Sequence, residues 1–305
     1  MNDFLRTAPF DLYELTLFHL VARQRSFTKA AELAGLTQSA VTRQVQGIES
    51  ALGLDLFERT TRSVRLTPAG QALWRESGRL LGEVDQTLAL LREEFGGAKK
   101  MIRVGVSRSV GLAYLPGFFH ANLRRLPQVG YRVAYQASEE IISALETNEL
   151  DVGVFAPPPR MPATVRVTHR FNDTFTLIAS PPAAADFEAN AATPAKRAAW
   201  LNRQDWLLID ERTNTGRRLQ SWLRRQGCRV EPAMQLDSFD LIANLVALGM
   251  GASAAPIRAL ALYHSRRALR RIAWPDRFVR ELVVAVRRHR KLPEHLSRFI
   301  DNVLF

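Results

Sequence analysis

A short stretch, residues 26–45, restricts the fold of this chain more than any other part of the sequence. Two helices joined by a tight turn need a small residue where they touch, a glycine in the turn and an apolar residue on the inner side of the second helix. Ala31, Gly35 and Val41 meet these needs at successive spacings of four and six residues. The stretch therefore predicts a helix-turn-helix whose second helix runs from Gln38 to about Leu52.

The residues around this motif predict a compact helical unit that ends in a hairpin. Apolar residues between positions 12 and 22 recur at helical spacing and indicate a preceding helix. Hydroxyl residues can cap the two helices of the motif, namely Ser26 or Thr28 for the first and Thr37 for the second. Residues 56–59 and 63–66 alternate in polarity around residues 60–62, which is typical of a small hairpin, or wing.

The second helix of the motif has one apolar side and one polar side. Val41, Val45 and Ile48 share its inner face. Its first turns expose amide, hydroxyl and guanidinium groups, on Gln38, Ser39, Thr42 and Arg43. Such groups can hydrogen-bond base edges and phosphates in a major groove, so the sequence predicts that this helix binds double-stranded DNA.

A long helix is predicted after the wing. Thr67 is a suitable cap, Pro68 fits the first helical position, and Gly96-Gly97 ends the helix. Its apolar residues form a heptad-like stripe at Leu73, Leu80, Val84, Leu88 and Leu91. Such a stripe is either buried within its own domain or paired with a second copy of the chain. The preceding unit is too short to cover so long a helix, which favours a homodimer seam.

From Met101 onward, strands and helices alternate. Strands are predicted at residues 101–106, 131–135, 150–155, 175–179, 206–210 and 281–286. Helices between the early strands indicate βαβ units and a parallel sheet. The late strand fits two α/β lobes in which the chain returns to the first lobe. Residues 181–194 are expected to form a loop with a helical piece.

Composition limits the setting but does not identify the partner. The net charge is +12, yet residues 1–95 hold 11 basic and 12 acidic residues, so the excess lies in the second part of the chain. That excess has two explanations. One is a coding bias toward arginine, and the other is a positive electrostatic field that attracts an anionic ligand. The single cysteine, Cys228, cannot form an internal disulfide and is more typical of a packing residue than of a redox sensor. No signal peptide or membrane span is visible, so we expect a cytoplasmic protein.

The extended pattern resembles the LysR-type transcriptional regulators. The resemblance rests on Ser26-Phe27-Thr28 with Ala30-Ala31, on Gln38-Ser39-Ala40-Val41-Thr42, on Ile48-Glu49 and Leu52-Gly53, on Leu56-Phe57-Glu58-Arg59, and on Leu66-Thr67-Pro68-Ala69-Gly70. Two departures are Ser39 where the family usually has Pro and Thr42 where it usually has Ser. A weaker likeness covers residues 101–305, where the family has a two-lobed α/β domain like type-2 periplasmic binding proteins.

The resemblance implies an α+β multidomain chain with three parts. Residues 1–67 would form a winged helix-turn-helix domain, residues 68–97 a linker and dimerisation helix, and residues 98–305 an effector-binding domain. Its lobe 1 is expected at about 98–160 and 270–305, and its lobe 2 at about 161–269. The family implies a homodimer that pairs again into a homotetramer, contact with RNA polymerase, and activation or repression of transcription in response to a small molecule.

The resemblance also places the DNA contacts. Recognition-helix contacts would fall on Gln38, Ser39, Thr42, Arg43 and Gln46. Ser26 and Thr28 would contact DNA at the start of the preceding helix. Arg59 and Arg62 lie on the wing, where the family touches the minor groove or the backbone, although Arg62 and Arg65 are equally consistent with plain surface charge.

Effector contacts are predicted where strands end, between the lobes. Ser107-Arg108-Ser109 follows the first strand of this domain and opens a helix, which favours an anion. Further candidates follow or precede other strands and helices, at Ser138, Phe155, Thr213, Thr215 and Phe239. Each serine or threonine is also a plausible helix cap. A small, anionic metabolite is therefore the expected effector.

Three other classes of protein compete with this assignment. The sequence has no nucleophile elbow, paired metal ligands or phosphate loop, so we expect neither an enzyme nor a bound cofactor or metal. A solute-binding transport protein fits the second part alone, and the helix-turn-helix opposes it. An architectural DNA-binding protein would not need the α/β region of some 200 residues. A small molecule that shifts the melting temperature of the protein would exclude this class.

Overall fold

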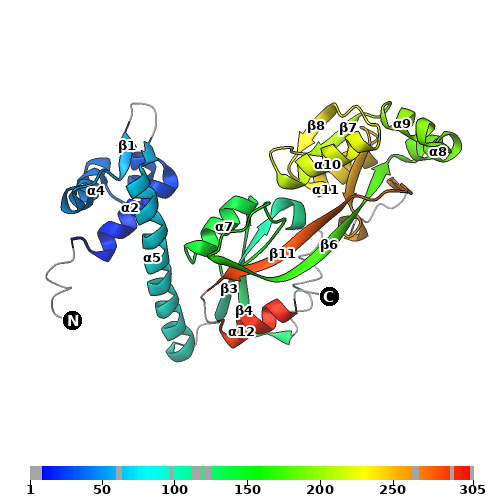
Figure 1. Ribbon diagram of the computed structural model, residues 1–305. Helices are drawn as coiled ribbons and strands as arrows, with labels where there is room; N and C mark the ends of the chain where they lie inside the picture. The colour runs from blue at the N-terminus through cyan, green and yellow to red at the C-terminus, as the bar shows by residue number, and fades with distance from the viewer. Residues whose placement is uncertain are drawn as a thin grey trace. The chain divides into compact units, whose positions relative to one another are not determined.

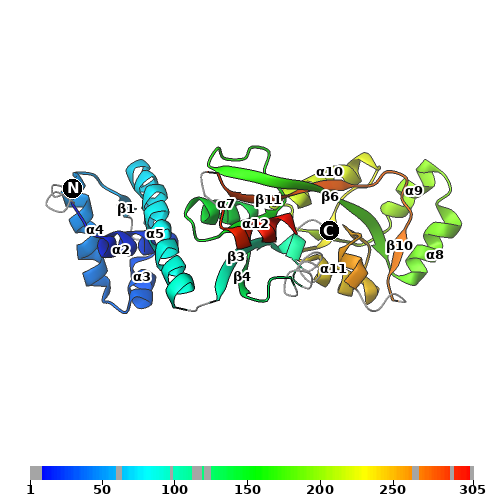
Figure 2. The same cartoon turned by 90° about the horizontal axis from the view of Figure 1, so that it is seen from below.

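The chain folds into two compact units in a computed structural model (Figures 1 and 2). The structure describes residues 9–59, 64–96, 99–111, 119, 125–262, 268–288 and 292–302. The first unit comprises residues 1–98 together with 146–149, and the second comprises residues 99–145 and 150–305.

The first unit contains the predicted helix-turn-helix and wing. Its elements in order are α2 (Leu12–Gln24), α3 (Phe27–Ala34), α4 (Gln38–Leu52), β1 (Phe57–Arg59), β2 (Val64–Leu66) and α5 (Pro68–Phe95). Strands β1 and β2 pair antiparallel. Phe18, Val21, Val41, Val45 and Ile48 are fully buried in a common core. The inner side of α4 is therefore the one that the apolar periodicity predicts.

Local signals set the ends of these helices. The hydroxyls of Ser26 and Thr37 accept hydrogen bonds from backbone N–H groups in the first turns of α3 and α4, as predicted. Gly35 and Gly53 end the same two helices in the left-handed conformation, at φ +66° and +65°. Thr67 caps α5, and Pro68 occupies its first position. These short-range interactions explain why the helix boundaries could be predicted.

Lobe 1 of the second unit is built on a mixed sheet. Its elements are β3 (Lys100–Ser107), β4 (Val129–Gln136), α7 (Ser138–Glu146), β5 (Val152–Phe155) and α12 (Glu294–Asp301). Strand β3 pairs parallel with β4 and with β5, whereas β11 (Val279–Arg287) pairs antiparallel with β5. The sheet is thus only partly parallel, because the returning strand runs the opposite way. Buried clusters cover both faces of this sheet.

Two long strands connect the lobes. Strand β6 (Val165–Ala179) pairs antiparallel with β11 along its first part and then continues into lobe 2 (Figure 1). There it pairs with β9 (Ser253–Pro256) and β10 (Arg270–Ile272). The prediction at residues 175–179 found only the end of β6, because its first ten residues include many polar and charged side chains. Because β10 and Phe278 belong to lobe 2, the return to lobe 1 takes place within β11.

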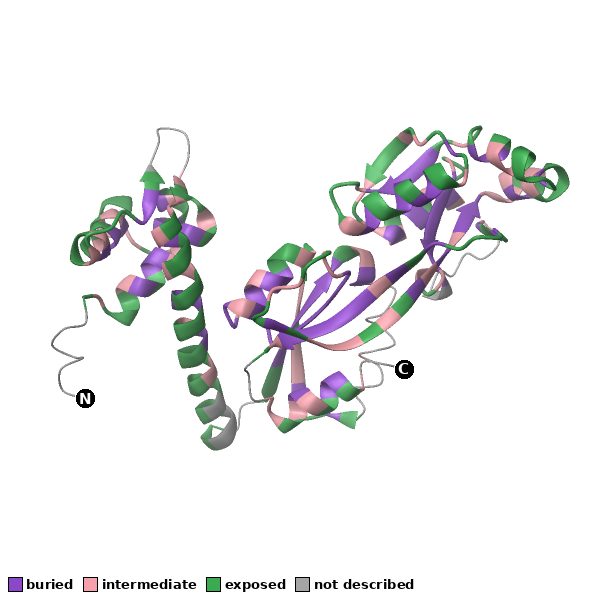
Figure 3. Cartoon of the chain, viewed as in Figure 1, coloured by how far each residue is buried: buried purple, intermediate pink, exposed green. Residues whose placement is uncertain are grey.

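Lobe 2 encloses the largest of the buried clusters among the described residues. Buried residues are purple in Figure 3, on strands and on the inner sides of helices. Its remaining elements are α8 (Pro181–Asn190), α9 (Pro194–Leu201), β7 (Trp206–Ile209), α10 (Asn214–Arg225), β8 (Pro232–Leu236), α11 (Phe239–Ala247) and the 3₁₀ turn Ala259–Leu262. Strands β7 and β8 pair parallel. Residues 181–194, predicted as a loop with a helical piece, are helical over most of their length. Proline at the first helical position explains this, since there it needs no hydrogen-bond donor.

Candidate DNA-binding surface and effector cleft

The outer side of α4 carries the predicted base-reading residues. Gln38, Ser39, Arg43 and Gln46 are exposed and Thr42 is partly exposed. Ser39 shares a hydrogen bond of 3.1 Å with Thr37, between the two side-chain oxygens. No such contact restrains Arg43, whose side chain makes no hydrogen bond or ion pair with the described residues. The folded chain thus presents these groups to solvent rather than to its own core.

The side chains of the other predicted DNA contacts differ in exposure and in the hydrogen bonds that they already make within the protein. Thr28 is exposed on the first turn of α3. The hydroxyl of Ser26 accepts a hydrogen bond of 3.3 Å from the backbone N–H of Lys29, so Ser26 already acts as a helix cap. Arg59 ends β1, and Arg62 lies outside the described residues.

A buried arginine joins the two lobes. Arg280, at the start of β11, has a side chain only 1% exposed and pairs with Asp173 of β6 at 2.8 Å. Its guanidinium also donates to the hydroxyl of Ser109 at 2.9 Å, to the carbonyl of Ser109 at 2.7 Å and to the hydroxyl of Thr215 at 3.1 Å. Ser109 follows β3 in lobe 1 and Thr215 opens α10 in lobe 2. All three guanidinium nitrogens are engaged, so Arg280 ties the lobes together.

Aromatic rings enclose the same guanidinium. Its central carbon lies 5.2 Å from the ring centroid of Phe175 and 5.5 Å from that of Phe239. Phe175 and Phe239 also meet edge to face at 5.4 Å. A cation that faces aromatic rings away from water gains a favourable electrostatic interaction. Three of the predicted effector residues, Ser109, Thr215 and Phe239, are therefore gathered around Arg280.

Two further contacts cross between the lobes. Arg108, next to Ser109, pairs with Asp237, which follows β8, and both side chains are more than half exposed. Asn214 donates a hydrogen bond of 2.8 Å from its side chain to the carbonyl of Pro157. An exposed ion pair of this kind contributes little to stability and can be exchanged for another partner.

Ser107 ends β3 beside these contacts. The residue is 6% exposed, and its hydroxyl has no hydrogen-bond partner among the described residues. A buried hydroxyl without a partner costs free energy, so its presence needs an explanation.

Two of the remaining predicted effector residues also have a structural role in this fold, and the third opens a helix. Thr213 caps α10, accepting from the N–H of Gly216 at 2.9 Å and donating to the carbonyl of Asp210 at 2.7 Å. Ser138 is the first residue of α7. Phe155 is fully buried in lobe 1, in a cluster that includes Ile141.

Carboxylates also shape the charge of this region. Hydrogen bonds from Arg212 hold the pKa of Asp210 below its usual value. Burial raises the pKa of Asp240, beside Phe239, and a hydrogen bond with Ser238 opposes that shift in part. Arg108 and Arg280 are each paired with a carboxylate, so neither adds an unpaired positive charge to the contacts between the lobes.

Sequence reasoning missed Arg280 and Asp173, although a signal for both was present. Arg280 stands in alternation with Leu282 and Val284, and Asp173 with Phe171 and Phe175. A charged residue at a core-facing position of each of two strands indicates a buried ion pair. The pairing itself could not be predicted, because the two residues are 107 positions apart in the chain.

Cys228 lies in the core of lobe 2 and is 4% exposed. Burial raises the pKa of its thiol to about 11, and a hydrogen bond with Trp206 opposes the shift only in part. At neutral pH the thiol is therefore protonated, which is the unreactive form. This favours the packing role over the redox-sensor role.

Cys228 is expected to resist thiol reagents in the folded protein. At pH 8 only about a thousandth of a thiol with such a pKa is ionised. Labelling with a chromogenic disulfide should be slow in buffer and fast in guanidinium chloride. Rapid labelling of the folded chain, or a change in DNA binding on mild peroxide treatment, would restore the sensor hypothesis.

Metal ligation and membrane insertion find no support in the described parts of the chain. No cluster there brings together three or more histidine, cysteine, aspartate or glutamate side chains in a way suited to a metal. Among the same residues, no helix combines the length and apolar character needed to span a bilayer.

Comparison with known proteins gives consistent matches over the whole chain. Residues 12–71 match the family described as bacterial regulatory helix-turn-helix protein, lysR family, and residues 95–304 match the LysR substrate binding domain. The RuBisCO operon transcriptional regulator of Allochromatium vinosum is 27% identical over 300 residues, covering 96% of this chain and 95% of that protein. The HTH-type transcriptional regulator YofA of Bacillus subtilis is 28% identical over 247 residues, covering 81% of each.

Solved structures share the fold. A full-length OxyR variant from Pseudomonas aeruginosa matches with a TM-score of 0.66 and 22% identity, covering 96% of this chain and 93% of that one. Full-length CbnR in complex with its target DNA matches with a TM-score of 0.63 and 20% identity, covering 96% and 99%. These matches confirm the predicted order of a winged helix-turn-helix followed by a two-lobed α/β domain.

Proposed function

This chain belongs to the LysR family of DNA-binding transcriptional regulators, and we propose that it recognises its operator by inserting the exposed polar side of α4 into the major groove. Proteins of this family are transcriptional regulators with an effector-binding domain, and they are not enzymes. One observation carries the proposal: the predicted contact residues of α4 face solvent while its apolar residues fill the core.

The chemistry of each exposed α4 side chain indicates which bases it can recognise. Arg43 can donate two hydrogen bonds to one guanine, and Gln38 and Gln46 can pair with adenine. Ser39 and Thr42 accept or donate to either kind of base edge. Thr28, Ser26, Arg59 and Arg62 are proposed to contact the backbone or the minor groove, which fixes the position of α4 without reading sequence.

Replacing Arg43 by alanine is expected to weaken operator binding by about 1–3 kcal/mol, roughly five- to 150-fold, because a bidentate guanine contact is lost. Only the affinity for operator DNA should fall, and the affinity for scrambled DNA should not change. The dependence of affinity on salt concentration should also stay the same. A fluorescence-anisotropy titration with operator and with scrambled DNA measures both.

Arg79→Ala is the matched control for this experiment. Arg79 is an exposed arginine of the same unit, but it is paired with Glu76 at 3.1 Å. Its replacement should leave both affinities unchanged. Equal operator affinity of Arg43→Ala and the unaltered chain would remove Arg43 from the base-reading set.

We further propose that the chain works as a homodimer through α5, which pairs again into a tetramer. Two winged heads would then occupy spaced half-sites of an inverted repeat. Effector binding would change the angle between subunits, the bend of the DNA and the contact with RNA polymerase. Whether transcription rises or falls depends on operator position, so activation and repression are both compatible with this arrangement. Such a protein acts in the cytoplasm, where the bacterial chromosome lies.

The effector is proposed to be a small anionic molecule bound between the lobes, near Ser107 and Arg108. Its negative group would take the place of Asp237 on Arg108, and the hydroxyl of Ser107 would donate a hydrogen bond to it. The exposure of the Arg108–Asp237 pair supports such an exchange, because little stability is lost with it.

Asp237→Asn gives a direct test of the charge of the effector. Removing the competing carboxylate should raise the affinity for an anionic effector and leave the affinity for neutral or cationic compounds unchanged. A thermal-shift screen of carboxylates, phosphates, amines and sugars, run on both chains, compares the two classes. Stabilisation only by neutral or cationic compounds would contradict the proposal.

A further inference from the structure

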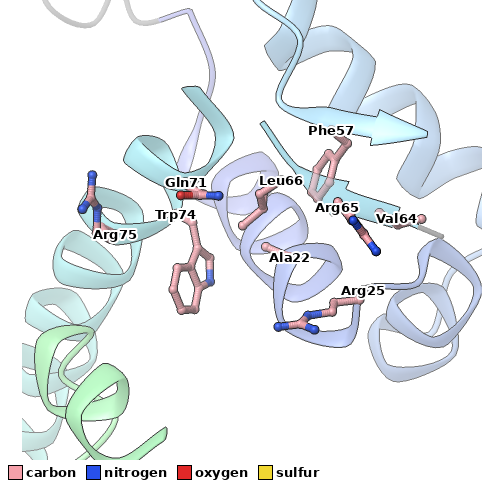
Figure 4. A pocket seen from close by; sticks show the side chains of 9 residues that line it. All are labelled: Ala22, Arg25, Phe57, Val64, Arg65, Leu66, Gln71, Trp74 and Arg75. Atoms are coloured by element: carbon pink, nitrogen blue, oxygen red, sulfur yellow. The ribbon is translucent and has the colours of Figure 1, made fainter. Parts of the chain in front are cut away.

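Arginines line a hollow in each of the two units. In the first unit the hollow lies beside the wing, where Arg25 and Arg65 lie toward one side and Arg75 lies beyond the ring of Trp74 (Figure 4). An aromatic ring thus divides the positive groups of that hollow instead of forming its base. The hollow of the second unit lies on lobe 2, and hydrogen bonds hold most of its polar side chains in place.

The lobe 2 hollow lies between α10 and residues 276–279, which lead into β11, and has a volume of about 330 Å³. Its apolar lining includes the rings of Trp222 and Phe278, whose residues are only 4% and 5% exposed. The lining residues of α10 stand at positions 218, 221, 222 and 225, a spacing that puts them on one face of the helix. Both the volume and the apolar base are typical of a site for a small molecule.

The carboxylate in this hollow is held by neutral donors. Oδ2 of Asp276 accepts a hydrogen bond of 3.1 Å from the indole nitrogen of Trp222 and one of 2.7 Å from the side-chain amide of Gln226. Asp276 makes no ion pair with the described residues, although three arginines line the same hollow. Three positive groups and one negative group therefore leave two positive charges in the lining.

The three arginines retain most of their hydrogen-bond donors. Arg277 is exposed and makes no hydrogen bond or ion pair with the described residues. Arg225 donates to the hydroxyl of Ser221 at 3.2 Å, and Arg218 donates to the carbonyl of Val279 at 3.3 Å. A guanidinium group has five N–H donors, so each of these arginines can bind a further acceptor.

Two aromatic rings separate the lobe 2 hollow from the buried Arg280. The ring of Phe175 lies 5.2 Å from the guanidinium carbon of Arg280 and 4.9 Å from the ring of Phe278. The guanidinium carbon of Arg218 lies 5.9 Å from the ring of Phe278. None of the described residues proposed to hold the effector between the lobes lines this hollow. It is therefore a separate site.

We propose that the lobe 2 hollow binds a small organic dianion, as a second ligand site besides the one proposed between the lobes. The ligand carries two carboxylates or one phosphate monoester, either of which has about two negative charges at neutral pH. These charges match the two that the lining leaves uncompensated. The negative groups accept hydrogen bonds from Arg277, Arg225 and Arg218, and the carbon skeleton packs on Trp222 and Phe278.

Calorimetric titration of the full chain with glutarate, phthalate, glycerol phosphate and phenyl phosphate tests this proposal. The first two compounds carry two carboxylates and the last two carry a phosphate monoester, so the panel also tells which dianion the site prefers. At least one compound should bind. Arg277→Gln and Arg225→Gln should each weaken that binding by about tenfold, because each removes charge-assisted hydrogen bonds.

Two further variants act as controls. Arg217 is an exposed arginine of the same helix that does not line the hollow, and it donates to the carbonyl of Arg212 at 2.9 Å. Arg217→Gln should therefore leave the affinity unchanged. Arg108→Gln alters the proposed effector site between the lobes and should also leave it unchanged. Because Arg277 has no partner to lose, Arg277→Gln should keep the melting temperature of the ligand-free chain.

Three results would overturn the proposal. One is the absence of binding by all four compounds, which would not affect DNA binding by α4. Another is an equal loss in Arg217→Gln and Arg277→Gln, which would indicate a general effect of charge. The third is a loss in Arg108→Gln with full affinity in Arg277→Gln and Arg225→Gln, which would place the dianion between the lobes.

Discussion

Arg280→Met is expected to destabilise the effector-binding domain by about 3–5 kcal/mol. The change removes the positive charge from a buried ion pair with Asp173, whose side chain is 0% exposed. It also removes the donor shared by the hydroxyls of Ser109 and Thr215. Removing one charge of a buried ion pair is among the most costly single substitutions, so Arg280→Met should lower stability far more than a substitution on the exposed side of α4.

Urea unfolding followed by tryptophan fluorescence measures this loss. Four of the five tryptophans, Trp200, Trp206, Trp222 and Trp274, belong to the core of lobe 2, so the signal reports mainly on this domain. A second variant, Arg280→Met with Asp173→Leu, replaces the pair by apolar side chains and should recover most of the stability. A single variant as stable as the unaltered chain would mean that Asp173 is not held as an ion, and a double variant less stable than the single would exclude the ion-pair explanation.

Two milder variants test whether the contacts of Arg280 affect the response to an effector. Arg280 contacts Ser109 of lobe 1 and Thr215 of lobe 2, so it links the two lobes. Ser109→Ala and Thr215→Val remove one acceptor each without placing a charge in the core. We expect these two variants to remain folded and to change how strongly an effector shifts DNA binding.

Val84→Lys with Leu88→Lys is expected to convert the protein to a monomer. These residues belong to a stripe on α5 that is exposed in the isolated chain: Leu80, Val84, Leu88, Leu91 and Phe95 are 37–77% exposed. Large apolar side chains in a continuous exposed row indicate an interface, and two lysines per copy would repel across it. Affinity for an operator with two half-sites should fall by about 10²–10⁴-fold, since the second head no longer binds at high effective concentration.

Sedimentation velocity gives the oligomeric state, and titrations of one-site and two-site DNA give the affinities. Binding to a single half-site should be unchanged, which shows that the winged unit is still folded. Leu248→Lys is the control, because Leu248 is 76% exposed but lies at the end of α11, away from the stripe. Persistence of the dimer in the α5 variant would place the seam elsewhere.

The sequence was sufficient wherever structure is decided by neighbours in the chain. Helices α2 to α5 follow from apolar spacing, from caps such as Ser26 and Thr37, and from glycine at Gly35 and Gly53. The exposure of Arg43 follows from the same periodicity, since the opposite side of α4 is apolar. Such features depend on interactions over three or four residues, so no tertiary information is needed to predict them.

The effector cleft was only partly predictable. Hydroxyl residues at strand ends follow from their position in the pattern, but that pattern does not distinguish Thr215, which contacts Arg280, from Thr213, which caps α10. Phe155 occupies a strand end as well, yet its side chain fills the core of lobe 1. The direction of a side chain at a strand end depends on how neighbouring strands and helices pack. That packing involves residues far apart in the chain, so local sequence patterns do not predict it.

What the sequence determined by itself is the winged helix-turn-helix, the long helix with its apolar stripe, and the presence of an α/β domain behind them. Only the tertiary structure brought Arg280 to Asp173 and gathered Ser109, Thr215 and Phe239 around it. The physical reason is the range of the interactions. Periodicity and capping act within a few residues, whereas a buried ion pair forms only after distant segments have packed together.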